Sequence, residues 1–265
     1  MPSRRLPAVA GIFYPAQANL LYDTISQLLA ENQRQLACAP KALIVPHAGY
    51  QYSAAVAACA YSTLQPFAHT YQRVVLAGPA HRVAFSGLCV PATGIFSTPL
   101  GEIPLQAPAA LTAQTTLSDL PHQLEHSLEV QLPFLQHILP EFTLTPLLAG
   151  HTTASAMAEA LEQLWGDSGT LIVISSDLSH YLSYDHARQK DRATLQQILR
   201  GDADLDGDQA CGAIPIAGLL QCIRQHQLTG HLLDYRNSGD TAGDRQRVVG
   251  YAALAYCEEH HDTIH

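Results

Sequence analysis

Short, unbroken apolar runs recur along the 265-residue chain, and stretches of mixed polarity separate them. Runs of Val, Ile and Leu without strict alternation are typical of strands that are buried on both faces of a sheet. The pattern therefore predicts strands at residues 42–45, 73–77, 88–92, 142–148, 171–175, 230–235 and 248–256. Residues 99–104 begin and end with proline and contain a glycine, which predicts a surface hairpin or turn.

Between these runs, apolar residues recur at the three- and four-residue spacing of an amphipathic helix. Helices are predicted at residues 19–32, 53–64, 125–139, 152–165, 184–199 and 211–225. Ser53 is suited to cap the second of them, and Thr152 or Thr153 the fourth. Strands that alternate with helices over the whole length predict an α/β fold, a three-layer single domain with a mixed, largely parallel central sheet. We expect one domain over residues 1–265, with a core from about residue 7 to about residue 256 and a loose C-terminal tail.

Composition and charge exclude several classes of function. The net charge is -9, and no basic cluster is present to neutralise phosphates, so we expect neither a nucleic-acid partner nor an anionic membrane partner. No apolar run is long enough to span a bilayer, and Pro7 and Pro15 interrupt any signal-peptide pattern. Six scattered cysteines form no C-x-x-C pair, which predicts a cytoplasmic protein with reduced thiols. The motifs of serine hydrolases, P-loop NTPases and dinucleotide-binding proteins are absent.

The chain is rich in histidine, with fourteen residues, as many as Lys and Arg together. His47, His81 and His180 each follow a predicted strand after small residues or proline. Ligands bind beyond the carboxyl ends of strands in open α/β sheets, so neighbouring parallel strands would bring these imidazoles into one crevice. Imidazole is the commonest metal ligand, and two histidines with a carboxylate suit non-haem Fe(II). Taken singly, each histidine could equally be a hydrogen-bonded loop residue.

Four more residues could contribute to such a crevice. His126 is either a site residue or an ordinary first-turn residue of a helix whose dipole Glu125 complements. Asp177 could ligate a metal, orient an imidazole or form a turn. Asp240 lies in a glycine-rich loop that is either a solvated turn or a source of one carboxylate. Cys211 opens a predicted helix whose N-terminus would lower the thiol pKa, and a buried structural cysteine is the alternative.

Seven ordered motifs resemble the Memo family, whose bacterial and archaeal members are often labelled AmmeMemoRadiSam system protein B. They are AGIFYP, PHAGYQYS, GPAHR, EHSLEVQLPFL, SSDLSHY, CGAIPI and YRNSGD…VVGYAA, and the resemblance is collinear from about Pro7 to Tyr256. The resemblance implies an α/β fold similar to that of the class III extradiol ring-cleaving dioxygenases. Those enzymes hold Fe(II) with two histidines and one glutamate.

Carried over by motif, His47 and His81 are the expected metal ligands and His180 is the expected catalytic acid or base. Asp177 and His126 resemble further catalytic residues of the crevice. The third ligand departs from the pattern, because the cysteine of the animal branch corresponds to Thr241 here. A hydroxyl is a poor ligand for iron or copper, so we expect the adjacent Asp240 to complete the metal site.

The expected function is therefore a mononuclear metal-binding protein with a dioxygenase-like crevice, an oxidoreductase that uses Fe(II) or, by family analogy, copper. One alternative is a non-catalytic module on the same fold that binds a small molecule or peptide and needs no cofactor. Another is a metal-assisted hydrolase or transferase. The label of the bacterial branch also implies association with a radical-SAM protein and an AMMECR-type protein.

Overall fold

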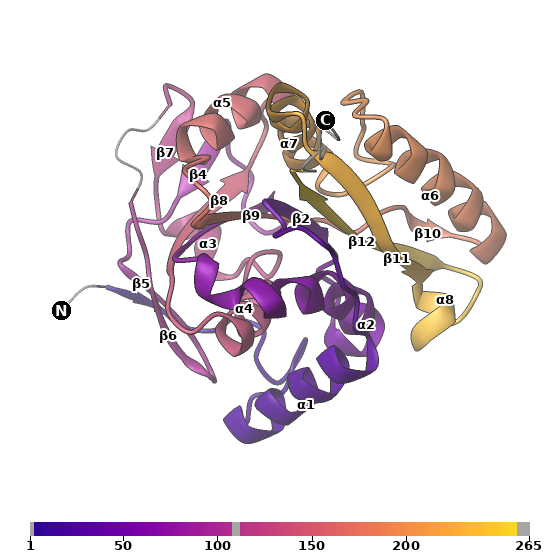
Figure 1. Cartoon of the computed structure of the whole chain (residues 1–265), viewed down its shortest axis with the longest axis horizontal. Coiled ribbons are helices and arrows are strands. Elements are labelled where there is room, and N and C mark those ends of the chain that lie inside the picture. The colour runs from indigo at the N-terminus through magenta and orange to yellow at the C-terminus, as the bar shows by residue number, and fades with distance from the viewer. Residues whose placement is uncertain (1–2, 108–111, 259–265) are drawn as a thin grey trace, which may run out of the picture.

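The computed structural model describes residues 3–107 and 112–258, in which the predicted apolar runs form one mixed nine-stranded sheet (Figure 1). Its path is β10 (His180–Leu182), β12 (Val248–Cys257), β2 (Ala42–Val45), β9 (Thr170–Ser175), β3 (Arg73–Pro79), β8 (Thr143–Ala149), β4 (Leu88–Val90) and β7 (Thr115–Leu117). The strands β2, β9, β3 and β8 are parallel to one another, whereas β12 is antiparallel to β2 and β4 to β8. β11 (Thr229–Asn237) pairs with β12. The predicted α/β fold with a mixed sheet is confirmed.

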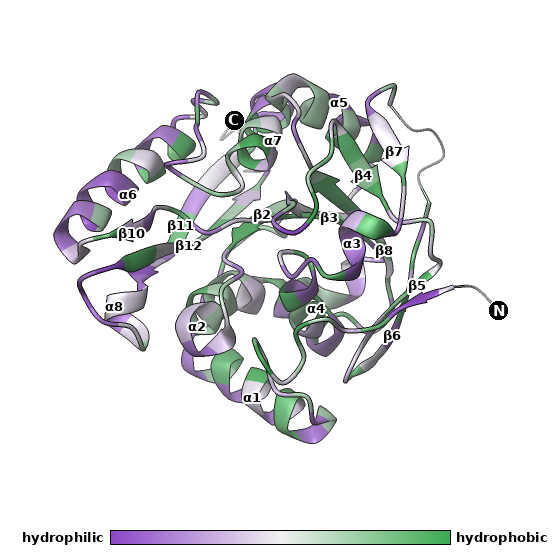
Figure 2. Cartoon of the chain, turned by 180° about the vertical axis from the view of Figure 1, so that it is seen from behind, coloured by the Kyte–Doolittle hydropathy of each residue, from purple (hydrophilic) through white to green (hydrophobic). Residues whose placement is uncertain are grey.

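Helices cover both faces of this sheet because its central strands are apolar on both sides. Leu43 and Val45 pack in one apolar cluster with α1 (Ala18–Glu31), α2 (Tyr50–Tyr61), the 3₁₀ helix η1 (Ser62–Thr70) and α4 (Leu132–Ile138). Ala42 and Ile44 face the opposite cluster, which contains α5 (Ala154–Leu164), α6 (Tyr184–Leu199) and α7 (Ala213–His226). Figure 1 shows the two helical layers on either side of the sheet, and Figure 2 shows the apolar colouring of the strands between them.

A small three-stranded sheet lies beside the main one near the N-terminus (Figure 1). β5 (Ile95–Thr98) and β6 (Gly101–Pro104) pair antiparallel, so the turn predicted at residues 99–104 is part of a hairpin. β1 (Arg4–Arg5) adds to β5 in parallel, which fixes the start of the chain against the rest of the molecule.

Two helix predictions need correction. α2 begins at Tyr50 after Gly49, and Ser53 lies within it, where its hydroxyl donates to the carbonyl of Ala48 instead of capping the helix. The single helix predicted at residues 125–139 is broken into α3 (Leu120–Gln123), a loop, the 3₁₀ helix η2 (Glu129–Gln131) and α4. In the loop, the Glu125 carboxylate is turned back onto the backbone N–H groups of His126 and Ser127 and also accepts from those of His81 and Arg82, and Pro133 lies in the first turn of α4.

The expectation of reduced thiols fails for one pair, because Cys38 and Cys257 form a disulfide. The sequence separation of 219 residues between them hides this pairing from any motif search. Cys59, Cys89, Cys211 and Cys222 are free. Within the described residues, no helix combines the length and apolar character that crossing a bilayer requires. The predicted loose tail falls mostly on residues 259–265, outside the described part of the chain.

Candidate functional site

Three neighbouring parallel strands end at one pocket. His47 follows β2, Asp177 follows β9 and His81 follows β3, each two residues after its strand. Because β9 pairs with both β2 and β3, the three strand ends lie side by side. The pocket has a volume of about 460 Å³ and is lined by His47, His81, Arg82, His126, Asp177, His180, Tyr181 and Cys211. The structure thus brings together six of the seven candidate residues, Cys211 among them, and leaves out Asp240.

His47 is held so that one ring nitrogen faces the pocket. The side chain is 2% exposed, and its Nδ1 lies 3.0 Å from Ser175 Oγ. Ser175 Oγ already donates to the Ser127 carbonyl, so it accepts a hydrogen bond from His47 Nδ1–H. The Nε2 atom of the ring is then unprotonated and keeps its lone pair. Nε2 lies 3.2 Å from the Sγ of Cys211. Burial, followed by repulsion from His81 and His126, holds the pKa of His47 well below its usual range, so the imidazole is neutral.

Glu125 holds the His81 ring by a hydrogen bond and lies beside the ring of His126. Its Oε1 lies 3.1 Å from His81 Nδ1 and 3.2 Å from His126 Nδ1, and the two rings stack with centroids 5.0 Å apart. The carboxylate also accepts backbone N–H groups of His81, Arg82, His126 and Ser127. Burial alone would raise the Glu125 pKa, but these hydrogen bonds, led by the His81 side chain and the Ser127 amide, lower it to about 2. Glu125 is therefore a carboxylate at every physiological pH.

The loop approaches β3 closely because Gly78 has no side chain. A Cβ atom at Gly78 would lie 2.9 Å from Leu128 Cδ2. The Ser127 hydroxyl donates to the Pro79 carbonyl at 2.8 Å, which fixes the loop over the strand end. Gly78 thus allows the loop to pack against the end of the strand.

Asp177 and Cys211 form the floor of the pocket. Asp177 is 4% exposed, and its Oδ1 accepts from the backbone N–H of His47 at 2.7 Å. Burial raises the Asp177 pKa to about 7. Of the two interpretations of Cys211, the lowered pKa at a helix start is not observed: burial, together with the nearby Asp177 charge, raises the pKa to about 12, as a buried cysteine implies. Burial outweighs the effect of the helix N-terminus here, so the thiol is protonated unless a cation displaces the proton.

His180 lies on the opposite wall, at the start of β10. Burial lowers the pKa of His180, although a hydrogen bond with the Leu178 backbone opposes the shift. A neutral imidazole at this position can accept a proton from a bound molecule near neutral pH. The next residue, Tyr181, has a left-handed backbone with φ of 61° and also lines the pocket.

Asp240 is the predicted site residue that the structure does not bring to the pocket. It lies in α8 (Ser238–Thr241), where its carboxylate accepts from the backbone N–H of Asn237 at 3.0 Å and from the Tyr184 hydroxyl at 2.5 Å. Asn237 and Asp240 make a capping box, a sequence signal that our prediction overlooked. Thr241 lines a different hollow, beside Phe13 and Tyr52. The ligand set of His47, His81 and Asp240 is therefore not assembled.

A different set of donor atoms is assembled. Two groups of three ligand atoms lie within 4.8 Å of one another. One group comes from His47, His81 and Cys211, and the other from His81, Glu125 and His126. Cys211 was noticed in the sequence for its place at a helix start, and Glu125 only for its charge. The sequence contains no signal that would place either of them beside the two histidines.

Comparison with known proteins confirms the family that the sequence motifs indicated. A family profile described as Memo-like protein matches residues 5–255. The chain belongs to the Memo family. A MEMO1 family protein of Methanopyrus kandleri is 34% identical over 281 residues, covering 95% of this chain and 98% of the relative. One from Methanosarcina acetivorans is 37% identical over 272 residues (94% and 98%), and one from Aquifex aeolicus is 32% identical over 268 residues (95% and 98%). The Memo match includes every residue that lines the pocket.

The donor groups of this Memo protein, taken as the metal site proposed below, predict that Glu125→Gln weakens metal binding by about 10- to 100-fold. The amide has one acceptor oxygen, so it cannot serve both the His81 ring and the loop N–H groups, and that ring loses its orientation. Titration of the apoprotein with iron or copper measures the effect. Glu159→Gln, on the exposed surface of α5, is the matched control. Equal affinities for the two variants would show that Glu125 does not orient the histidines.

Proposed function

We propose that the pocket holds one transition-metal ion through His47, His81 and Cys211, and that the protein is an iron- or copper-dependent oxidoreductase. The observation that carries the proposal is the convergence of these three donor atoms within 4.8 Å. The remaining ring nitrogen of each histidine is engaged, His47 by Ser175 and His81 by Glu125. Such outer hydrogen bonds are typical of metal-ligating histidines because they fix the tautomer and the ring plane.

The donor set fits the group that the family resemblance implies. Imidazole suits both iron and copper, and a thiolate adds affinity for copper in particular. A bound cation deprotonates a coordinating thiol, which would overcome the raised pKa of Cys211. The metal would supply the redox chemistry that protein side chains lack. The loss of Asp240 from the set exchanges a carboxylate for a thiolate and so favours a softer ion than the one first expected.

His180 and Asp177 are suited to move and hold protons around a bound substrate. His180 is neutral, lines the pocket and belongs to no ligand group that the described residues form, so it can act as the general base. Asp177 has a pKa of about 7 and is fixed by the His47 amide, so it can carry a proton near neutral pH. Arg82, on the rim, can attract an anionic substrate.

Oxygen consumption by metal-loaded protein tests the proposal. The protein is loaded anaerobically with Fe(II) or with copper and then mixed with oxygen and catechol, a probe chosen for the resemblance to extradiol dioxygenases. We expect consumption in the parent and a decrease of about 10²- to 10⁴-fold in His180→Gln with metal content unchanged. His69→Gln, an exposed residue of η1, is the control.

Two outcomes would contradict the proposal. A loaded parent that consumes no oxygen with catechol or related phenols would favour the non-catalytic module or the metal-assisted hydrolase. Loss of metal from His180→Gln would mean that His180 is a ligand and not the base.

A further inference from the structure

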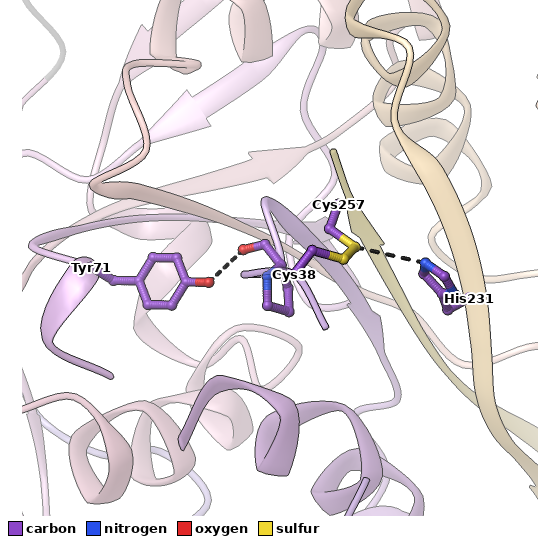
Figure 3. The surroundings of a disulfide bond; sticks show 5 residues. Cys38, Tyr71, His231 and Cys257 are labelled. Atoms are coloured by element: carbon purple, nitrogen blue, oxygen red, sulfur yellow. Dashed lines mark hydrogen bonds between the residues drawn. A yellow bond between two sulfur atoms is a disulfide. The ribbon is translucent and has the colours of Figure 1, made fainter. Parts of the chain in front are cut away.

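A second cluster of metal-binding side chains surrounds the disulfide. Cys38, His231 and Cys257 each offer a ligand atom, and these atoms lie within 4.8 Å of one another. Figure 3 shows the His231 ring directed from β11 toward the sulfur of Cys257, with Nε2 and Sγ 3.7 Å apart. Cys257 is buried, whereas Cys38 and His231 are partly exposed, so reagents from solvent reach the cluster.

The three residues are brought together by the register of the sheet. Thr229 on β11 is opposite Cys257 on β12, and His231 lies two residues further along the same face. Such a diagonal pair lies within reach of a long side chain. Cys38 approaches from the segment before β2, which is fixed by the Lys41 N–H donating to the Tyr256 carbonyl at 2.7 Å. The Tyr71 hydroxyl also donates to the Pro40 carbonyl at 2.7 Å (Figure 3).

We propose that this cluster is a redox-gated zinc site. In the oxidised protein Cys38 and Cys257 are joined, and their sulfurs are not available as thiolates. A dithiol reductant attacks one sulfur to form a mixed disulfide, and its second thiol then releases both cysteines while it is oxidised to its own disulfide. Zn²⁺ next binds the two sulfurs and His231, and the two thiol protons pass to solvent.

The donor chemistry favours zinc. Two thiolates and one imidazole are soft and borderline ligands that zinc accepts in tetrahedral sites. Bond lengths of about 2.3 Å to sulfur and about 2.0 Å to nitrogen place tetrahedral donors about 3.5 to 3.8 Å apart. The observed 3.7 Å between Cys257 Sγ and His231 Nε2 is already in this range. Cys38 lies in a bend outside the strands, so it can move away from Cys257 without a change in the sheet.

This site is separate from the strand-end pocket. β12 is antiparallel to β2, and Tyr256 pairs with Ala42 at the start of β2, whereas His47 follows the end of that strand. The cluster and the pocket therefore lie at opposite ends of the same strands. The proposal does not depend on the oxidoreductase function.

Zinc uptake by oxidised and reduced full-length protein tests the proposal. His47→Ala/His81→Ala/Cys211→Ala serves as the background, so that only the disulfide cluster is counted. After reduction with an excess of a dithiol and its removal under nitrogen, we expect about one equivalent of bound zinc, and none before reduction. Substituted Co²⁺ should show thiolate-to-cobalt charge-transfer absorption. Cys38→Ser, Cys257→Ser and His231→Ala should each lower zinc affinity by about tenfold or more, whereas Cys222→Ala should not.

Each remaining result would overturn the proposal. Reduced protein that keeps its circular dichroism spectrum and binds no zinc would leave a plain structural disulfide. Reduced protein that unfolds even with zinc present would show that the bridge is needed for the fold itself. Zinc uptake that Cys38→Ser and His231→Ala leave unchanged would place the ion elsewhere.

Discussion

Replacing His47 and His81 together with alanine is expected to reduce iron or copper bound in the strand-end pocket from about one equivalent per chain to the background level. The substitution removes two of the three assembled donors, and the remaining Cys211 thiol has a raised pKa and cannot compete for an ion alone. Metal analysis after anaerobic reconstitution and desalting measures the loss. The Cys38–Cys257 disulfide is kept intact during loading, so the second cluster does not contribute.

His69→Ala/His186→Ala is the matched control for this experiment. Both residues are exposed on helices away from the pocket lining, and the substitution removes the same number of imidazoles. Equal metal content in the parent and in His47→Ala/His81→Ala would reject the proposed metal centre. Circular dichroism of the apoproteins shows whether the loss comes from the ligands or from unfolding, because His47 is also a buried side chain.

Arg5→Met is expected to lower the free energy of unfolding by about 3 to 5 kcal/mol. The guanidinium of Arg5 lies 2.8 Å from the Glu129 carboxylate, and both side chains are almost fully buried. Arg5 also donates to the carbonyls of His122 and Glu125, so it joins the start of the chain to the loop that carries the site. Without Arg5, the buried Glu129 charge keeps its hydrogen bonds from Ala8, Val9 and Tyr14 but loses its counter-charge.

Denaturant unfolding of three variants tests this prediction. Arg4→Met is the neighbouring control, because Arg4 pairs with Glu102 on the surface and should contribute at most about 1 kcal/mol. Arg5→Met/Glu129→Gln should recover part of the loss, since the charge that Arg5 balanced is then absent. If Arg5→Met and Arg4→Met cost the same, the buried pair does not stabilise the fold.

The strands could be predicted from sequence because burial on both sides leaves an unbroken apolar run. β2 was predicted at its observed bounds, and β9 within one residue. The same reasoning placed His47 and His81 at strand ends, because a strand end is a local feature of the sequence. Ligands bind beyond the carboxyl ends of parallel strands, so the two histidines were expected to lie together. The pairing of β9 with both β2 and β3, which makes this true, is not local and became known only from the structure.

The errors arose where a side chain replaces a backbone partner or where distant residues meet. The periodic leucines at residues 125–139 predicted a helix, but Glu125 is bonded to His81 and Arg82, more than forty residues away in the sequence, and its segment forms a loop. Asp240 was assigned to the metal because it is adjacent to Thr241, which replaces the cysteine of the animal branch, yet it caps a short helix. The encounter of Cys38 with Cys257 depends on the antiparallel return of β12 to β2, which no local pattern encodes.

The pocket is more rigid on one side than on the other. His47, Asp177 and His81 follow three strands in the middle of the sheet. Each of these strands is hydrogen-bonded to a neighbour on both sides, so its end moves only if the middle of the sheet opens. His180 and Tyr181 belong instead to the three-residue edge strand β10, which pairs with β12 alone among the strands of the described chain, through an irregular register. The side chains of His180 and Tyr181 can therefore shift to fit molecules of different shape. The distances among His47, Asp177 and His81 stay fixed.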